Sequence, residues 1–450
     1  MKPTTEKCTQ SIPTLIVGLG LSGLSCARFL ARQGVSVAII DSRMDPPGMQ
    51  QLRETLPDVP VFVGGFDKAA FSAAQRLVVS PGVSLQEPFI QQAMARGVEI
   101  CSDISLFAVN AKAPIAAITG SNGKSTVTTL LAEMAKRSGR KTLLGGNIGI
   151  PALDLLAQPT PELYVLELSS FQLETATQIS AAVATVLNIS EDHMDRYAGL
   201  EEYSLAKRAI FNGAGVRVLN RDDPSVAAMA EDDQNEHWFT LNTPAANDYG
   251  LRWQDDQLWL AQGEMLLLPA TEVCMAGRHN LANALAALAM GDALNLEREA
   301  MLETLRNFGG LPHRCQFVAR INGVAWYNDS KATNVGATLA AVNGFDEPLV
   351  LIAGGQGKGA DFTPLCGAAE KLKAVVLIGE DRDKIAKVLQ GKVLLEQAND
   401  MADAVNKAHQ LSQPGESVLL SPACASFDMF EGFEQRGEQF MGLVRALKDG

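Results

Sequence analysis

The sequence lacks an excess of positive charge. Its 450 residues contain 38 Lys and Arg against 51 Asp and Glu, which gives a formal net charge of −13. General nucleic-acid binding needs a basic surface, so the composition argues against a nucleic-acid partner. Any phosphate site must be built locally, from particular cationic side chains and backbone N–H groups.

Long apolar runs and paired cysteines are also missing. No stretch of about 18 apolar residues occurs, so no membrane span is expected. The first residues, MKPTTEKCTQSIP, lack the apolar stretch of a signal peptide. The seven cysteines are odd in number and contain no C-x-x-C pair, which argues against a disulfide framework or a structural zinc site. We therefore expect a cytoplasmic protein with reduced thiols.

Short apolar strands, glycine-containing turns and amphipathic helices alternate along the chain. This order predicts an α/β protein with largely parallel sheets. Three units can be separated, at 1–103, 104–310 and 311–450. Residues 278–293 predict an Ala-rich helix, and 231–270 alternate weakly, as in an antiparallel excursion. Strands are predicted at 14–20, 35–41, 76–80, 114–119, 163–168, 183–189, 324–328, 349–353, 374–378 and 417–421.

The first strand is followed by a glycine-rich turn, Gly18–Gly23, which reads GLGLSG. With Asp41 at the end of the next strand, it matches a dinucleotide-binding fingerprint, in which the acid binds a ribose hydroxyl. Two other interpretations stay open: a turn needed only for close packing, and a site for another diphosphate nucleotide such as a UDP-sugar. The neighbours Ser42 and Arg43 support the UDP-sugar, since Arg43 can contact a diphosphate.

A second glycine-rich turn lies between a predicted strand and a predicted helix. Successive small residues let N–H groups point at a phosphate, and the helix N-terminus adds partial positive charge. Lys124 would reach the β- and γ-phosphates, and Ser125 or Thr126 would hold Mg²⁺. Position 118 is Ile, so the turn is a variant of the usual phosphate loop. The turn consists of Gly120, Ser121, Asn122, Gly123, Lys124, Ser125 and Thr126.

Glu167 and His193 follow neighbouring predicted strands. Ligands of open parallel sheets bind beyond the carboxyl ends of the strands, so this pair beside Ser125 could hold Mg²⁺ or Mn²⁺. We expect the pair and Lys124 to face a common cavity. The alternative is a solvated acidic loop, because the segment after Ile189 reads SEDHMD. Spacing alone makes Lys207 a surface lysine on a helix.

Polar segments also follow the strands of the last unit. Arg314 and Lys331 are candidates for γ-phosphate binding or for stabilising a transferring phosphoryl group. Lys358, in a glycine-rich segment, and Ser426 could bind a ligand carboxylate. The thiol of Cys424 is more often buried filler than a nucleophile.

Taken in order, seven segments of this chain resemble the Mur ligase family: GSNGKST, ELSSFQLE, EDHMDRY, GRHN, LPHR, NDSKATN and SPACAS. The resemblance covers essentially the whole chain. It implies a Rossmann-like N-terminal domain that binds a UDP-linked substrate, a central P-loop ATPase domain, and a Rossmann-like C-terminal domain that binds an amino acid. Within the family, the match is closest to members that add D-glutamate to UDP-N-acetylmuramoyl-L-alanine.

The resemblance also implies roles for particular residues. It assigns catalysis to Lys124, His193, Lys207 and Lys331. It assigns the UDP-linked substrate to Gly18, Leu19, Asp41, Ser42, Arg43, Gly82 and Asn147. It assigns ATP to residues 120–126, Asn280, Arg314 and Asp329, and D-glutamate to Thr333, Lys358, Ser426 and Phe433. It assigns Mg²⁺ or Mn²⁺ to Ser125, Glu167, His193 and Lys207, the last as a carbamylated side chain. One departure is Gln356, where the family pattern has Asp.

The expected reaction activates a carboxylate with ATP as an acyl phosphate, which the amine of D-glutamate attacks to give a tetrahedral intermediate. The partners are small molecules, and a monomer is expected. Alternatives are a sister Mur ligase, a folylpolyglutamate synthase, an NAD-dependent oxidoreductase and a nucleotide-binding regulator without catalysis. The oxidoreductase leaves the second glycine-rich turn unexplained.

Overall fold

The computed structural model of this chain describes residues 12–176, 178–192, 194, 196–231, 235–275, 277–345 and 347–447. The chain forms two compact units. Unit 1 comprises Met1–Ile189, His193–Trp238 and Ala287–Met301, and unit 2 comprises Ser190–Asp192, Phe239–Ala286 and Leu302–Gly450.

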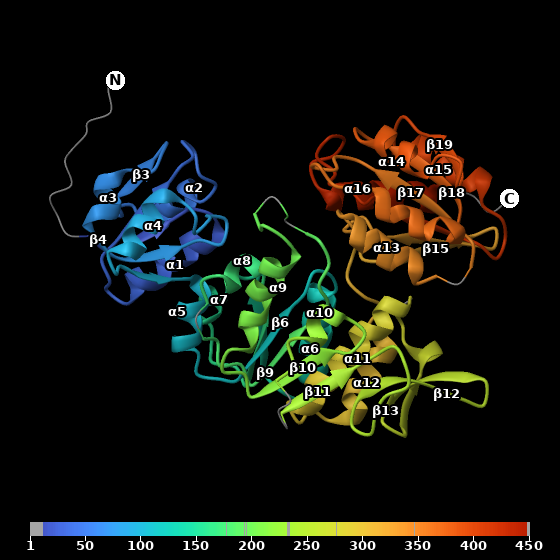
Figure 1. The fold of residues 1–450 in the computed structure, drawn as a ribbon, viewed down its shortest axis with the longest axis horizontal. Helices are drawn as coiled ribbons and strands as arrows, with labels where there is room; N and C mark the ends of the chain where they lie inside the picture. Colours follow the sequence, from blue (N-terminus) through green and yellow to red (C-terminus); the bar gives the residue numbers. More distant parts are fainter. Residues whose placement is uncertain are drawn as a thin grey trace. The chain divides into compact units, whose positions relative to one another are not determined.

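Unit 1 begins with a parallel five-stranded sheet of order β3-β2-β1-β4-β5. Helices cover both faces (Figure 1). Its strands are β1 (Ile12–Val17), β2 (Val37–Asp41), β3 (Val61–Val63), β4 (Ala74–Val79) and β5 (Glu99–Cys101). Its helices are α1 (Leu21–Arg32), α2 (Met49–Thr55), α3 (Lys68–Ala73), α4 (Pro88–Ala95) and α5 (Asp103–Asn110).

A second group of parallel strands in unit 1 has the order β10-β9-β6-β8-β7. The strands are β6 (Ile115–Thr119), β7 (Thr142–Gly146), β8 (Leu163–Glu167), β9 (Val183–Val186) and β10 (Val216–Asn220). The accompanying elements are α6 (Lys124–Arg137), α7 (Ala152–Leu155), α8 (Ser170–Leu173), α9 (Leu200–Arg208), η1 (Ala209–Phe211), α10 (Pro224–Ala227) and β11 (Glu236–Phe239). Helix α6 packs on β7 and β8.

Unit 2 contains an antiparallel meander and a second α/β sheet. The meander is β12 (Tyr249–Gln254), β13 (Gln257–Gln262) and β14 (Met265–Pro269), followed by η2 (Ala270–Glu272). Helices α11 (Arg278–Ala293) and α12 (Arg298–Asn307) have residues in both units.

The α/β sheet of unit 2 has the order β15-β16-β20-β17-β18-β19. Only the β15–β16 pair is antiparallel. Its strands are β15 (Gln316–Ile321), β16 (Val324–Asn328), β17 (Leu349–Gly354), β18 (Leu372–Ile378), β19 (Leu394–Gln397) and β20 (Ser417–Leu420). Its helices are α13 (Val335–Asn343), η3 (Thr363–Lys371), α14 (Arg382–Leu389), α15 (Met401–Leu411) and α16 (Phe433–Ala446).

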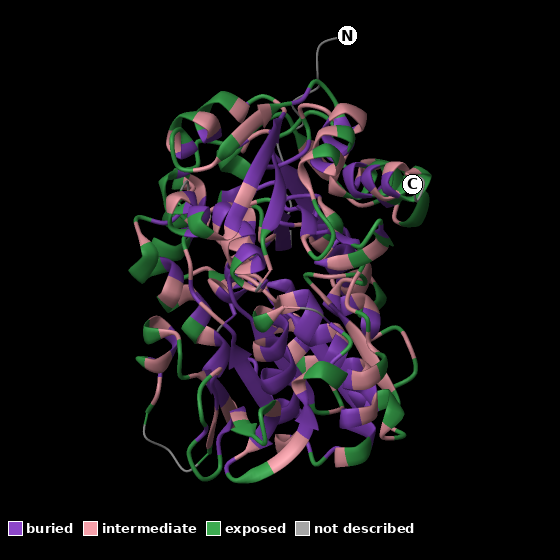
Figure 2. Cartoon of the chain, turned by 90° about the vertical axis from the view of Figure 1, so that its right-hand side faces the viewer, coloured by how far each residue is buried: buried purple, intermediate pink, exposed green. Residues whose placement is uncertain are grey.

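The continuous apolar runs of the central strands follow from burial on both faces of the sheet. In β17, Leu349 and Leu351 enter the core that packs under α13 and α14, whereas Val350 and Ile352 enter the core under α15 and α16. Successive side chains of a strand point to opposite faces, so a strand covered on both sides has no polar positions. Figure 2 shows the central strands largely in the colour of buried residues.

The predicted α/β class with largely parallel sheets is confirmed, as are the predicted strands in outline. The helix predicted at 278–293 has those bounds, and the antiparallel excursion is confirmed for β12–β14. Six strands were not predicted, because they are short or only partly buried: β3, β5, β7, β10, β15 and β19.

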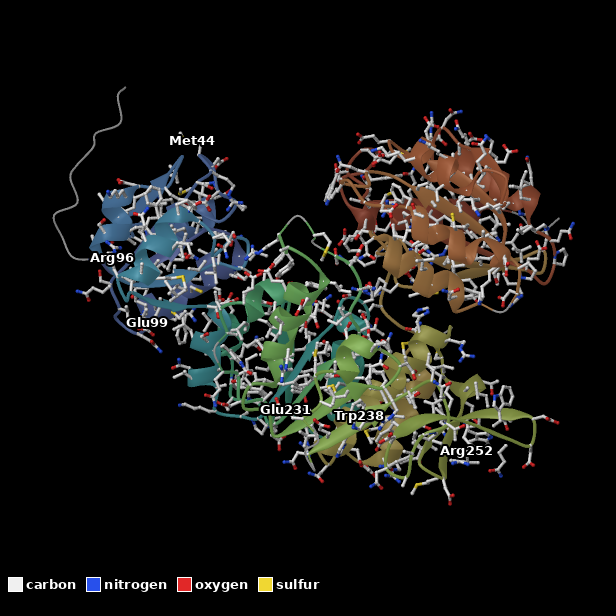
Figure 3. All side chains as sticks on the ribbon, viewed as in Figure 1. Met44, Arg96, Glu99, Glu231, Trp238 and Arg252 are labelled. Atoms are coloured by element: carbon white, nitrogen blue, oxygen red, sulfur yellow. The ribbon has the colours of Figure 1, made fainter. Side chains whose placement is uncertain are left out.

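Most charged side chains of the described residues lie outside the buried core. Arg96, Glu99 and Glu231 are exposed and point away from the sheets (Figure 3). Within the described ranges, no helix is long and apolar enough to cross a membrane. Six of the cysteines lie in these ranges, and all six are free thiols.

Candidate functional site

The first glycine-rich turn joins β1 to α1 and requires glycine at specific positions. Gly18 has a φ of +95°, and a Cβ on Gly23 would lie 2.0 Å from the carbonyl oxygen of Gly18. The helix therefore starts against the backbone of the turn. This close approach leaves the N-terminus of α1 open beside the ends of β1, β2 and β4, where anions bind favourably.

A pocket of about 560 Å³ opens at this turn. Of the residues assigned to the UDP-linked substrate, Gly18, Asp41, Ser42, Arg43, Gly82 and Asn147 line it. Leu19 does not line it, because its side chain is fully buried. Gly20, Leu21 and Ser22 of the predicted glycine-rich turn also line the pocket. The sequence analysis missed the other wall residues: Phe66, Ser80, Pro81, Val83, Gly146, Gly149, Pro151 and Gln172.

Asp41 is engaged within the protein. Its carboxylate accepts hydrogen bonds from Nε, Nη2 and the backbone N–H of Arg43 at 2.7–2.9 Å, and from the backbone N–H of Leu19 at 2.7 Å. Burial acts to raise the pKa of Asp41, but these hydrogen bonds outweigh it and hold the pKa below its ordinary value. A carboxylate has about four acceptor positions, so this arrangement disfavours the dinucleotide interpretation, in which the acid holds ribose hydroxyls.

The second glycine-rich turn joins β6 to α6, as predicted. Gly123 precedes the helix with a φ of +81°, a left-handed conformation that favours glycine. Lys124 bends back over the turn, and its Nζ donates to the carbonyl oxygens of Gly120 and Ser121 at 2.8 Å each. The ammonium group is thus held over the loop at the N-terminus of α6, where a phosphate would bind.

Asn188, which the sequence analysis did not single out, holds this loop from the end of β9. Its carbonyl oxygen accepts from the N–H of Ser121 at 2.9 Å. Its side chain accepts from the N–H of Asn122 at 2.8 Å and donates to the carbonyl oxygen of Asn122 at 3.1 Å. Two N–H groups of the loop are therefore committed to Asn188, which fixes the backbone of the loop before α6.

Glu167 ends β8, next to the strand that carries the phosphate loop. It pairs in register with Ile118, two residues before Gly120. One carboxylate oxygen accepts from Nδ2 of Asn147 at 2.7 Å, and the other is buried without a hydrogen-bond partner among the described residues. A buried carboxylate oxygen of this kind fits a bound cation, because a carboxylate is a preferred oxygen ligand of Mg²⁺.

The other proposed metal ligands are only partly placed. Ser125 lies in the first turn of α6, whereas His193 lies outside the described residues. Within the described ranges, no group of three or more His, Cys, Asp or Glu side chains is gathered as a metal site.

The expectation that Lys207 is a surface lysine was wrong. Its side chain is 1% exposed, although it does lie on a helix, α9. Its Nζ lies 3.4 Å from Oγ1 of Thr119, at the end of β6, and 4.5 Å from the ring centroid of Tyr203. Tyr203 is also buried, and its hydroxyl lies 3.3 Å from Oγ of Ser121. The lysine therefore lies beneath the phosphate loop.

In unit 2, three neighbouring parallel strands carry most of the predicted polar segments at their carboxyl ends. Asp329 follows β16, Ser421 follows β20 and Gly355 follows β17. Asp329 is buried and accepts from Oγ of Ser421 at 2.8 Å and from the N–H of Cys315 at 3.1 Å. Burial raises the pKa of Asp329 to about 7.

Lys331 and Phe433, which the sequence assigned to transfer and to D-glutamate, lie together. The ammonium group of Lys331 lies 3.8 Å from the ring centroid of Phe433. His313 packs edge-on against the same ring, and its Nδ1 lies 2.9 Å from Nδ2 of Asn328. The backbone N–H of Lys331 donates to the carbonyl oxygen of His313.

A buried arginine that the sequence analysis missed joins two of these segments. Arg436 donates to Oγ and the carbonyl oxygen of Ser330, and to the carbonyl oxygen of Cys424. Burial lowers the pKa of its guanidinium to about 10. Sequence periodicity gave no signal for it, because its partners, Ser330 and Cys424, are brought near only by the fold.

The remaining predicted residues of unit 2 are placed as follows. Lys358 is exposed near the ring of Phe427, with 5.4 Å between Nζ and the ring centroid. Ser426 is buried, and Thr333 is exposed. Asn280 is buried near the start of α11, and Arg314 is half-buried. Gln356, the departure from the family pattern, forms a backbone bridge with Ala425.

Family models match the chain in three segments. The Mur ligase MurD-like N-terminal domain matches residues 13–102 and the Mur ligase middle domain matches residues 118–291. The glutamate ligase domain of Mur ligases matches residues 313–424.

Curated relatives and solved structures are similar over the whole length. A protein of Nitrosococcus oceani is 54% identical, over 96% of both chains, and one of Pseudomonas putida is 53% identical, over 96% of this chain and 97% of the relative. Both are named UDP-N-acetylmuramoylalanine–D-glutamate ligase. A pseudomurein peptide ligase type C from Methanothermus fervidus, 18% identical, has a similar fold, with a TM-score of 0.58 over 96% of this chain and 100% of that one. The chain belongs to the Mur ligase family.

Proposed function

We propose that this protein is an ATP-dependent ligase that joins D-glutamate to the L-alanine carboxylate of UDP-N-acetylmuramoyl-L-alanine, a step in peptidoglycan precursor synthesis. The observation that carries the proposal is the identity of more than half of the residues, over nearly full length, to relatives named for that reaction. The two glycine-rich turns of unit 1 support it, because the reaction needs sites for two different nucleotides.

The pocket at Gly18–Gly23 is proposed to hold the UDP moiety. Arg43 lies at its edge, paired with Asp41, and offers a cation for the diphosphate. Ser42, Gly82 and Asn147 line the same space. Leu19 acts indirectly, because its backbone N–H fixes Asp41.

The loop from Gly120 to Thr126 is proposed to bind the phosphates of ATP, with Lys124 as its cation. Asn280, Arg314 and Asp329 are proposed to complete the ATP site. Ser125, Glu167, His193 and a carbamylated Lys207 are proposed to hold Mg²⁺ or Mn²⁺. One buried oxygen of Glu167 has no hydrogen-bond partner in the described part of the chain, and this and the burial of Lys207 support the assignment. A divalent cation at this place would neutralise charge on the β- and γ-phosphates.

The proposed reaction must first activate the L-alanine carboxylate, because oxide is a poor leaving group. Transfer of the γ-phosphoryl group from ATP to the L-alanine carboxylate gives an acyl phosphate and ADP. The amine of D-glutamate attacks the acyl carbon, and the tetrahedral intermediate expels phosphate as the amine loses a proton. Lys124 and Lys331 are proposed to offset charge on the phosphoryl oxygens, which is the main catalytic demand of such transfers.

The C-terminal part of the chain, from residue 311, is proposed to bind D-glutamate through Thr333, Lys358, Ser426 and Phe433. Residues 1–103 are proposed as the UDP domain and 104–310 as the ATP domain. A monomer in the cytoplasm is proposed. The free thiols of the described cysteines agree with that compartment.

Phosphate release tests the proposal directly. Purified protein with ATP, Mg²⁺ and UDP-N-acetylmuramoyl-L-alanine is offered D-glutamate, L-glutamate, L-alanine and diaminopimelate in turn. Release that depends strictly on D-glutamate is expected. Release with another amino acid would assign the chain to a sister reaction, and release without any amino acid would indicate a nucleotide hydrolase.

A further inference from the structure

One wall of the UDP pocket is the segment that follows β4. Ser80, Pro81, Gly82 and Val83 line the pocket. On one side, Oγ of Ser80 donates to the carbonyl oxygen of Gly18 at 2.9 Å, which joins the wall to the glycine-rich turn. The carbonyl oxygens of Pro81 and Val83 accept hydrogen bonds from a residue outside this segment.

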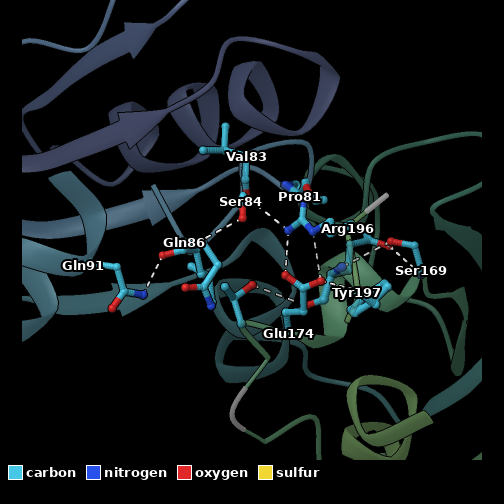
Figure 4. Close-up of polar contacts among 12 residues, drawn as sticks. Pro81, Val83, Ser84, Gln86, Gln91, Ser169, Glu174, Arg196 and Tyr197 are labelled. Atoms are coloured by element: carbon cyan, nitrogen blue, oxygen red, sulfur yellow. Dashed lines mark hydrogen bonds and ion pairs between the residues drawn. The ribbon is translucent and has the colours of Figure 1, made fainter. Parts of the chain in front are cut away.

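Those two carbonyl oxygens accept hydrogen bonds from Arg196, more than a hundred residues away in sequence. Its Nη1 donates to the oxygen of Pro81 at 3.1 Å, and its Nη2 donates to the oxygen of Val83 at 3.2 Å (Figure 4). Arg196 does not itself line the pocket. It therefore acts on the pocket only through the backbone of the wall.

Arg196 is itself held in place by the central part of unit 1. The Glu174 carboxylate accepts hydrogen bonds from Nε of Arg196 at 3.1 Å and from Nη2 at 2.6 Å (Figure 4). The guanidinium lies 4.4 Å from the ring centroid of Phe171. The hydroxyl of Tyr197 donates to Glu174 at 2.5 Å. The side chains of Arg196 and Glu174 are only 14% and 16% exposed, so water competes weakly for these bonds.

The geometry requires arginine. One guanidinium makes a two-bond contact with a carboxylate and still reaches two carbonyl oxygens, because its five donors form a planar fork. A lysine ammonium has three donors on a flexible stem and cannot serve both partners in this geometry. The positive charge is also compensated by Glu174, so it adds little net charge to the pocket.

We propose that Arg196 is a positioning residue for the UDP-linked substrate, which fixes the Pro81–Val83 wall of the pocket against the ATP-binding part of unit 1. The proposal rests on the proposed function for the identity of the ligand. It adds a residue that the pocket lining does not contain and assigns Glu174 to orient it. We call the hydrogen bonds from Arg196 to Pro81 and Val83 the Arg196 clamp. Its loss weakens UDP binding and leaves the phosphate loop, which Arg196 does not contact, unchanged.

Calorimetric titration of UDP and, separately, of ATP with Mg²⁺ tests the proposal on the full-length chain. Arg196→Lys keeps the charge and removes the fork. Each charge-assisted hydrogen bond that is lost weakens binding, so the Kd for UDP is expected to rise about tenfold or more. The Kd for ATP is expected to change by less than about twofold, since distant sites act independently.

Two further variants separate positioning from a general loss of folding. Glu174→Gln keeps Arg196 and its charge but weakens the bond that orients it, so a smaller rise in the UDP Kd is expected. Arg208→Ala removes an arginine from an exposed ion pair with Glu231 and is the matched control, with no change expected in either Kd. In turnover assays, the KM for the UDP-linked substrate should rise in the first two variants, whereas the KM for ATP should not.

The outcomes distinguish this inference from the proposed function. A wild-type protein that does not bind UDP would overturn both. A wild-type protein that binds UDP, with Arg196→Lys and Glu174→Gln binding it equally well, would overturn the inference alone. Equal losses of UDP and ATP binding would also overturn it, because they would show a structural role for the clamp in the whole unit.

Discussion

The two glycine-rich turns of unit 1 are similar in local structure and differ in what surrounds them. Each follows the end of a buried parallel strand, starts a helix and contains glycines in left-handed or closely packed positions. The first has a nearby carboxylate, Asp41, that Arg43 neutralises, and it opens into a cavity of unit 1. The second carries a lysine over the loop and lies beside Glu167 and the buried Lys207. A glycine-rich turn indicates phosphate binding, but its neighbours decide which nucleotide binds.

The largest expected effect comes from removing the lysine of the second turn. Lys124→Ala removes the only lysine of the second turn, and turnover should fall roughly 100- to 1,000-fold, because charge on the transferring phosphoryl group is no longer offset. The Kd for UDP should not change. Phosphate-release kinetics and UDP titration measure both effects. Near-normal turnover would show that this loop is not the ATP site.

A second test breaks the first turn by a single methyl group. Gly23→Ala places a Cβ 2.0 Å from the carbonyl oxygen of Gly18, so the helix must move. We expect a loss of about 2–3 kcal/mol in unfolding free energy, together with weaker UDP binding.

The matched control is Gly20→Ala in the same turn. A Cβ there meets no atom within 4 Å, and the φ of Gly20 is −95°. This variant should lose less than about 1 kcal/mol, the scale of a changed residue at a helix start. Urea unfolding of both variants compares them, and equal losses would contradict the packing argument.

The third test concerns Asn188, whose hydrogen bonds hold the second turn. Asn188→Ala leaves the N–H and the carbonyl of Asn122 without their side-chain partner. The cost of ordering the loop then falls on ATP binding, and the KM for ATP should rise about tenfold. Asn307→Ala, at an exposed helix end, is the control. An unchanged KM in Asn188→Ala would mean that the loop keeps its conformation without the side chain of Asn188.

Sequence reasoning located both turns because glycine, strand and helix signals coincide at each of them. It placed α11 and β17 well, since long apolar runs identify buried elements. It misjudged Lys207, because the helix that carries it reads EEYSLAKR, a mostly polar pattern that is typical of a surface. Arg196 lies in the EDHMDRY segment of the family pattern, but neither it nor Asn188 was given a role, because the fold alone brings their partners near: Pro81, Val83 and Glu174 for Arg196, and the phosphate loop for Asn188. Short edge strands such as β3 were missed for lack of a buried run.

The fourth test contrasts two buried aspartates at strand ends. Asp41 is held ionised by Arg43, whereas burial raises the pKa of Asp329 to about 7. An unfolded aspartate has a pKa of about 3.9, so the folded protein binds a proton at Asp329 that the unfolded chain releases. This contribution to stability is therefore full at low pH and is lost as pH rises from about 4 through about 7.

The asparagine of the Asp329→Asn variant cannot titrate, so the variant should not lose this part of its unfolding free energy as pH rises. Relative to the parent protein, the unfolding free energy of the variant should increase between pH 5 and pH 8 by up to a few kcal/mol, at about 1.4 kcal/mol per pKa unit. Urea unfolding at the two pH values measures the difference. A difference that stays constant with pH would show that Asp329 has an ordinary pKa.

The account depends on two separate nucleotide sites, and competition tests this most directly. UDP is titrated into the wild-type protein by calorimetry, first alone and then with ATP and Mg²⁺ at saturating concentration. The structure predicts one UDP bound per chain in both titrations. Loss of UDP binding when ATP is present would show that the two ligands share one site, and would contradict the assignment of the two turns.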